Sequence, residues 1–248
     1  IHTGNLVAAK FDHLTSRELD PQLHTHCVVM NMTQKENGEW RSLSNETLFD
    51  DKIKLGRIYR NELAKNLSDI GYGTTVTDRK QGFFEIKGVD EGLIQVFSKR
   101  REQVLDRYET LKASGQYPNM SEGQLKEIAA LDSRKIKPEH LNKETLKEDW
   151  AKTFEKSGFT IGGVKAEAKR QAELSNKKPS FTPGELIQKA MEIKTENESV
   201  FQKIDIMNEA ARLGIGDRVS ADQLEGAFKE MQKSGQLVFL GEQKAVGQ

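Results

Sequence analysis

Two runs near the start of the chain alternate apolar and polar positions in the manner of β-strands. The first covers residues 5–13 (NLVAAKFDH) and the second covers residues 24–32 (HTHCVVMNM). The stretch between them is rich in turn-forming residues, among them Ser16, Asp20 and Pro21. The pattern therefore predicts an antiparallel hairpin with a long connecting loop.

Three histidines, His13, His24 and His26, fall on these predicted strands. Residues two apart on a strand point to the same face, so His24 and His26 share a face with Val28. If His13 pairs opposite His24, the three rings converge, because opposed side chains lie about 5 Å apart. Three imidazoles with room for a water or substrate oxygen are typical of an open catalytic metal site. The alternative, that each is an ordinary polar or packing residue of its strand, stays open at this point.

The other candidate ligands fit the predicted site less well. Cys27 alternates to the opposite face, which makes it a poor fourth ligand and predicts a small core residue. Asp12 alternates away from His13 and is expected to be structural or solvent-facing. His2, near a chain end, and His140, in a highly charged region, are expected to be solvated.

Apolar spacing predicts further elements along the chain. A helix over residues 45–70 is followed by Gly71 as its stop, and a second hairpin pairs residues 74–77 with 82–89 around a polar turn. Residues 91–157 are expected to be helical and highly charged, with breaks at residues 115–119 and near Pro138. Three short helices over 181–193, 201–213 and 220–234 follow, the last with a Ser220–Gln223 capping box, and residues 236–240 form a terminal strand. The fold predicted is α+β.

The pattern also predicts a domain division. Residues 1–162 form a first portion with the three-histidine site. Residues 163–182 lack a convincing apolar stripe and are therefore predicted to be a linker, whose start is helical. Residues 183–248 form a small helical, winged-helix-like module. Its third helix is close to charge-balanced, so DNA binding and a packing or spacer role are both open.

Composition narrows the class of protein. The chain has 248 residues, 35% hydrophobic and 31% charged, with 38 basic and 38 acidic side chains and one cysteine. The lone cysteine excludes a disulfide framework and fits a reducing cytoplasm, and no apolar run approaches the ~20 residues of a membrane span. With a net charge of zero, any DNA binding must use local patches. Because the chain starts at Ile1, within a few residues of a strand, we expect it to be a piece of a longer protein.

The histidines sit within a denser pattern, which comprises TGNLV at 3–7, Phe11, TSR at 15–17, DPQLHTH at 20–26 and VVMN at 28–31. This pattern resembles the three-histidine motif of MobF-type conjugative relaxases, the TrwC/TraI type of the HUH superfamily. The resemblance continues through IYRNEL at 58–63, FEIKG at 84–88, FSKR at 97–100 and ALDSRK at 130–135. The tail is similar to the segment that precedes the helicase region in such proteins.

The resemblance implies a HUH relaxase-like antiparallel sheet in which His13, His24 and His26 bind one divalent ion (Mg²⁺, Mn²⁺ or Zn²⁺). Such enzymes nick one DNA strand at a plasmid transfer origin and transfer it, keeping the 5′ end on a tyrosine that comes before the histidines. All four tyrosines of this chain follow them: Tyr59, Tyr72, Tyr108 and Tyr117. We therefore expect the nucleophile in an upstream segment and the chain alone to be inactive.

The partner implied is single-stranded plasmid DNA in the bacterial cytoplasm, together with other relaxosome and secretion-channel coupling proteins and without membrane insertion. Basic residues within or near the matched motifs are candidate phosphate contacts: Lys10, Arg17, Arg41, Arg134 and Lys135. Two other classes of function are open on the residues alone. One is a three-histidine zinc hydrolase that uses metal-bound water, and the other is a non-catalytic module that binds single-stranded DNA.

Overall fold

The structure is a computed structural model and describes residues 3–135, 142–175, 179–238 and 240–241. It divides into two compact units that alternate along the chain. The first unit comprises Ile1–Asn45 and Val89–Val164, and the second comprises Glu46–Gly88 and Lys165–Gln248. His2 and His140 lie outside the described residues. The predicted linker at residues 163–182, which would separate residues 1–162 from residues 183–248, stays a prediction.

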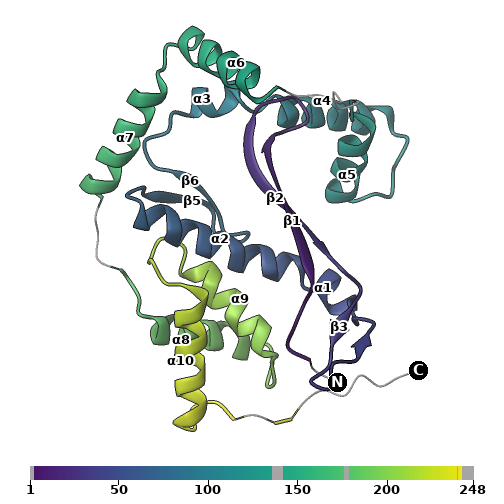
Figure 1. Cartoon of the computed structure of the whole chain (residues 1–248), viewed down its shortest axis with the longest axis vertical. Coiled ribbons are helices and arrows are strands. Elements are labelled where there is room, and N and C mark those ends of the chain that lie inside the picture. Colours follow the sequence, from purple (N-terminus) through teal and green to yellow (C-terminus); the bar gives the residue numbers. More distant parts are fainter. Residues whose placement is uncertain (1–2, 136–141, 176–178, 239, 242–248) are drawn as a thin grey trace. The chain divides into compact units, whose positions relative to one another are not determined.

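A long antiparallel hairpin leads the first unit (Figure 1). Strand β1 (Ala8–Thr15) pairs with β2 (Pro21–Val29), and His13 lies directly opposite His24. The predicted hairpin is confirmed, with both strands shifted by about three residues toward the connecting loop. A two-residue ribbon of β3 (Thr33–Gln34) and β4 (Trp40–Arg41) follows.

Among its described residues the first unit also contains α3 (Glu91–Val96), α4 (Lys99–Ser114), α5 (Glu122–Asp132) and α6 (Lys143–Lys156). Helices α4 and α5 share a small core of Tyr108, Leu111, Leu125 and Ala129. Helix α5 begins at a capping box made by Ser121 and Gln124. Helices α3 and α6 meet through two aromatic rings. Phe97 directly follows α3, Phe154 lies in α6, and their ring centroids are 4.9 Å apart.

The second unit begins with α1 (Glu46–Asp50) and α2 (Lys52–Asp69), so the single helix predicted over 45–70 is interrupted at Asp51. Strands β5 (Thr74–Asp78) and β6 (Phe83–Ile86) form the predicted second hairpin. Helix α7 (Ile161–Leu174) starts at the end of the first unit, continues into the second, and occupies the helical start expected of the linker. Helices α8 (Pro183–Thr195), α9 (Lys203–Leu213) and α10 (Ala221–Lys233) confirm the three predicted short helices.

The largest core of the second unit lies among α8, α9 and α10, which pack beside α2 (Figure 1). It is built from aliphatic side chains that include Leu186, Ile187, Ile206 and Leu224, all fully buried. The capping box predicted at Ser220 is present. The predicted terminal strand is not formed over the described residues 236–238, where backbone amides instead turn back to the end of α10, and residue 239 lies outside the described residues.

The fold class is therefore α+β, with small antiparallel sheets and helices. Within the described part of the chain, no helix combines the length and the apolar character that crossing a bilayer requires.

Candidate metal centre

The three histidines meet on one face of the β1–β2 hairpin because of its register. His13 opposes His24 and Phe11 opposes His26, so the alternation of each strand sends all three rings to the same side. Ring centroids lie 5.4 Å apart for His13 and His24, 4.5 Å for His13 and His26, and 5.0 Å for His24 and His26. One nitrogen from each ring lies within 4.8 Å of the others. The predicted convergence of the rings is confirmed.

A backbone contact orients one of the rings. Nδ1 of His24 lies 2.9 Å from the carbonyl oxygen of Gln22, which only accepts hydrogen bonds. A hydrogen bond at this contact requires the proton on Nδ1, and in the neutral ring that tautomer leaves Nε2 with the lone pair that a metal ion needs. Carbonyl partners of this kind commonly orient metal-binding histidines.

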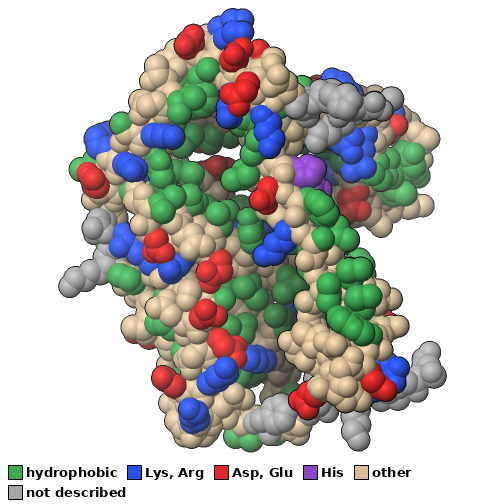
Figure 2. All heavy atoms as spheres, in the orientation of Figure 1, with side chains coloured by type: hydrophobic (Ala, Val, Ile, Leu, Met, Phe, Trp, Pro, Cys, Tyr) green, Lys and Arg blue, Asp and Glu red, His purple; other side chains and the backbone are tan. Residues whose placement is uncertain are grey.

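The histidine face is open to solvent. His13 and His24 are half-buried and His26 is exposed, and Figure 2 shows histidine side chains at the molecular surface. Phe11 and Val28 continue the same face toward the open end of the hairpin and are 52% and 55% exposed. A cluster of three imidazoles beside an open surface fits the chemistry of a catalytic rather than a closed structural site, because a fourth position is left for substrate or water.

The opposite face of the hairpin carries different chemistry. Thr25 Oγ1 donates to Asp12 Oδ1 at 2.6 Å, so Asp12 is turned away from the histidines as predicted. Cys27 opposes Lys10 and is exposed, so the expectation that this cysteine is a core residue was wrong. In a two-stranded ribbon neither face is buried unless another layer packs on it, and alternation alone does not reveal which face is covered.

The basic residues singled out in the sequence fall into three places. Arg17 and Lys135 meet, since Arg17 Nη1 donates to the Lys135 carbonyl at 3.3 Å; Arg134 is the neighbour of Lys135. Arg41 forms an ion pair with Glu39 at 3.0 Å. Lys10 lies on the face away from the histidines. A role of these five residues in DNA binding stays a prediction, with Arg17 and Lys135 sharing the loop end of the hairpin.

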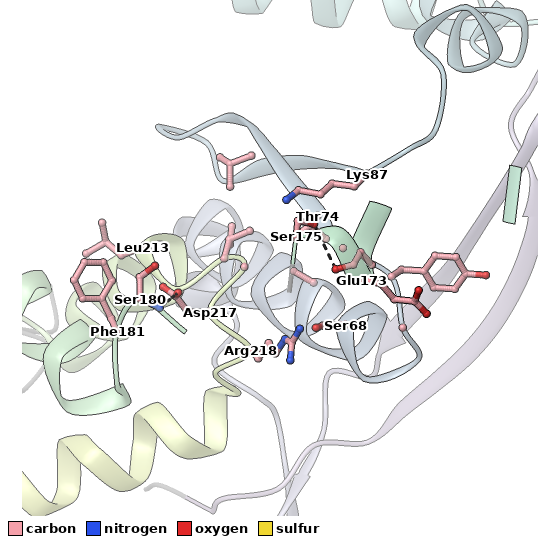
Figure 3. Close-up of a pocket in the computed structure, with 18 of the residues that line it drawn as sticks. Ser68, Thr74, Lys87, Glu173, Ser175, Ser180, Phe181, Leu213, Asp217 and Arg218 are labelled. Atoms are coloured by element: carbon pink, nitrogen blue, oxygen red, sulfur yellow. Dashed lines mark hydrogen bonds between the residues drawn. The ribbon is translucent and has the colours of Figure 1, made fainter. Parts of the chain in front are cut away.

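A cavity of about 780 Å³ lies within the second unit (Figure 3). Figure 3 shows Phe181 and Leu213 together at one end of its wall and Lys87 close to Thr74 and Ser175 at another. Its charged lining residues have both signs: Arg79, Lys87, Lys169, Arg218, Glu173 and Asp217. None of the described residues that line it is a histidine.

The tyrosines lie in other surroundings. Tyr108 is 6% exposed in the α4–α5 core, and Tyr117 packs against the same cluster. Tyr59 projects from α2 and is 64% exposed, and Tyr72 lines the cavity of the second unit.

Comparison with known proteins relates this chain to conjugative relaxases. Residues 1–157 match the TrwC relaxase family. The multifunctional conjugation protein TraI of Escherichia coli K12 is 32% identical over 254 residues, which cover 90% of this chain and 13% of TraI. The chain thus spans a small part of the length of the curated relatives it matches.

Solved structures of the conjugative relaxase TrwC in complex with oriT DNA are also similar. A copper-bound and a metal-bound form each show 40% identity and a TM-score of 0.55, over 63% of this chain and 52% of that chain. On the family match and on the converging histidines, this chain belongs to the TrwC relaxase family.

Proposed function

We propose that this chain forms the metal-binding part of a conjugative relaxase, which nicks one strand at a plasmid transfer origin and transfers it. The observation that carries the proposal is the convergence of three histidine rings on one open face, in a chain of the TrwC relaxase family. The place of action proposed is the bacterial cytoplasm, with the relaxosome and the secretion-channel coupling proteins as further partners.

His13, His24 and His26 are the residues that would hold the ion, one nitrogen from each ring. A divalent ion at this place supplies positive charge that polarises a phosphate oxygen and offsets the charge of the transition state. The carbonyl of Gln22 keeps the Nε2 lone pair of His24 available by holding the proton on Nδ1. The open face beside His26 leaves room for a phosphate to approach the rings.

The proposed partner is single-stranded plasmid DNA at the transfer origin, and the solved relatives in complex with oriT DNA support it. Arg17 and Lys135 lie together at the loop end of the hairpin, beyond the opposed pair of His13 and His24 and the bulge that follows it. We assign them, with Lys10, Arg41 and Arg134, to phosphate contacts. Such contacts supply affinity that falls steeply as salt rises.

Metal titration tests the proposal directly. The chain should bind one Mn²⁺ ion by calorimetry, and a His24→Ala, His26→Ala double variant should lose this binding. Cys27→Ala is the matched control, since Cys27 directly follows His26 in sequence but lies on the other face and is exposed. Unchanged Mn²⁺ affinity in the double variant would overturn the metal site.

The DNA arm of the test uses the origin strand of the plasmid that carries the gene. This strand should bind more tightly than a scrambled strand of equal length, with an affinity that decreases with salt. The full-length protein carrying the double histidine substitution should fail to nick it. Nicking at the normal rate would contradict the proposed catalytic role of the histidines.

A further inference from the structure

The loop that joins the two histidine strands, residues 16–20, has a defined conformation. The Ser16 amide donates to the Asp20 carbonyl at 2.9 Å, and the Asp20 amide donates to Ser16 Oγ at 3.2 Å. Leu19 has a φ of 62°, a left-handed conformation that costs a non-glycine residue about 1–2 kcal/mol. Such a conformation persists only where surrounding contacts hold it.

Asp20 is the most buried polar residue of this loop, with 2% of its surface exposed. Its Oδ2 accepts a hydrogen bond from the backbone amide of Lys99 at 3.0 Å, and its Oδ1 pairs with Lys99 Nζ at 3.2 Å. Lys99 is the first residue of α4, and the residue before it, Ser98, makes no side-chain capping bond. Asp20 therefore caps a helix that lies 79 positions away in the sequence.

Helix α6 and the segment that follows α5 also contact this loop. Trp150 of α6 donates from Nε1 to the Leu19 carbonyl at 2.7 Å. Lys135, just beyond α5, pairs with Glu18 at 2.9 Å. These contacts join the loop between the histidine strands to two other segments that resemble the relaxase motifs, residues 97–100 and residues 130–135.

Burial along β1 shows where the hairpin is supported. Its residues are exposed from Ala8 to Asp12, half-buried at His13 and Leu14, and buried at Thr15. The strand pairing also shifts its register between His13 and Thr15, at a bulge. The histidine cluster is thus next to the supported end of the hairpin and directly beside the register shift.

We propose that Asp20 is a positioning residue for the metal centre, which holds the loop against α4 and thereby keeps His13 opposite His24. This inference rests on the proposed metal-binding function. Without the carboxylate, the amide that begins α4 and the Lys99 ammonium both lose their partner. The loop is then free to change the bulge beside His13. Since a shift of one residue turns a strand side chain to the other face, even a partial shift separates the rings.

The experiment compares Mn²⁺ affinity and the visible spectrum of the Co²⁺-loaded protein for the wild type and for Asp20 variants. Asp20→Ala should lower Mn²⁺ affinity by about 10–100-fold, the range found when partners that orient metal ligands are removed. Its Co²⁺ spectrum should also change. Asp132→Ala is the matched control, because Asp132 also pairs with a basic residue of α4, here Arg107. The control should keep the wild-type affinity and spectrum.

Asp20→Asn provides the decisive variant if Asp20→Ala does not fold. It keeps an oxygen acceptor for the Lys99 amide but loses the charge, so it should stay folded by circular dichroism and bind Mn²⁺ more weakly than wild type. A folded Asp20→Asn with wild-type Mn²⁺ affinity and Co²⁺ spectrum would overturn the inference. A wild-type chain that binds no Mn²⁺ would instead overturn the proposed function, so the two failures are distinguishable.

Discussion

Asn61 and Val219 are joined by a buried hydrogen bond inside the second unit, although 158 positions separate them in the chain. Nδ2 of Asn61 on α2 donates to the Val219 carbonyl at 2.7 Å, just before α10 begins. Asn61 is 1% exposed and Val219 is 5% exposed, so water does not replace this bond when it is lost. The bond ties α2 to the helices at the end of the chain.

Asn61→Ala should therefore destabilise the second unit by about 1–3 kcal/mol, because it leaves a buried carbonyl without a donor. Urea denaturation followed by circular dichroism measures the change in the free energy of unfolding. Asn66→Ala on the same helix is the control, since Asn66 is exposed. Equal stability of the two variants would show that the Asn61 bond contributes nothing.

Gly88 fixes the approach of α7 to the second hairpin. Its φ is +80°, and a Cβ atom at this position would lie 2.9 Å from Gln171 Cγ and 3.1 Å from Ala168 Cα. Gly88→Val should displace α7 through both backbone strain and steric overlap. Trypsin should then cleave faster at Lys165 and Lys169, as followed by mass spectrometry.

Gly162→Ala is the control for this prediction, because Gly162 lies in α7 itself and a Cβ there meets open space. This change should leave cleavage as slow as in the wild type or slow it further, since alanine favours the helix. If both variants are cleaved at the wild-type rate, the close approach at Gly88 does not hold α7.

The pairing of Glu18 with Lys135 predicts a pH dependence of stability. The hydrogen bond from the Lys135 ammonium is the main cause that lowers the pKa of the Glu18 carboxyl from its ordinary value of 4.5. The pair therefore contributes stability that is fully present above pH 4.5 and is lost as the pH falls through the lower, folded-state pKa.

Glu18→Gln removes this titration. Thermal unfolding should show the variant less stable than wild type at neutral pH, by up to about 1 kcal/mol because Lys135 is largely exposed. The difference should shrink as the pH falls below 4.5. A difference that stays constant over this range would mean that the ion pair is not its source.

The histidine cluster could be predicted from sequence because it depends on local rules. Strand alternation and the direct opposition of His13 and His24 determine which way the rings point, and both follow from spacing within a single hairpin. The three terminal helices were predictable for the same reason, because their apolar positions recur at helical spacing.

The support of the site could not be predicted in this way. Asp20 lies beside a proline in a polar loop, so the sequence indicates a turn former, while the structure buries it against Lys99. Asn61 likewise has no local signal, since its partner is 158 positions away. Polar side chains that bond across the chain leave no periodic pattern, and only the folded arrangement reveals them.

The tyrosines lead to the final prediction, that this chain alone does not become covalently attached to origin DNA. The resemblance places the nucleophilic tyrosine before the histidines, whereas each tyrosine of this chain follows His26. Tyr108 is buried in the α4–α5 core, where its ring lies beneath Lys126 at 5.2 Å, so its hydroxyl is poorly placed to attack a phosphate. Incubation with a labelled origin oligonucleotide and Mn²⁺ should therefore give no protein–DNA adduct that survives a denaturing gel.

The four Tyr→Phe variants test whether any tyrosine of this chain attacks DNA, because each variant removes a single hydroxyl and keeps the ring. Tyr59 is the critical test, since 64% of its surface is exposed. An adduct formed by the wild-type chain and lost in Tyr59→Phe would identify a nucleophile after the histidines and contradict the expected order. An adduct that persists in all four variants would point to a different attacking group and would contradict the tyrosine nucleophile that the resemblance implies.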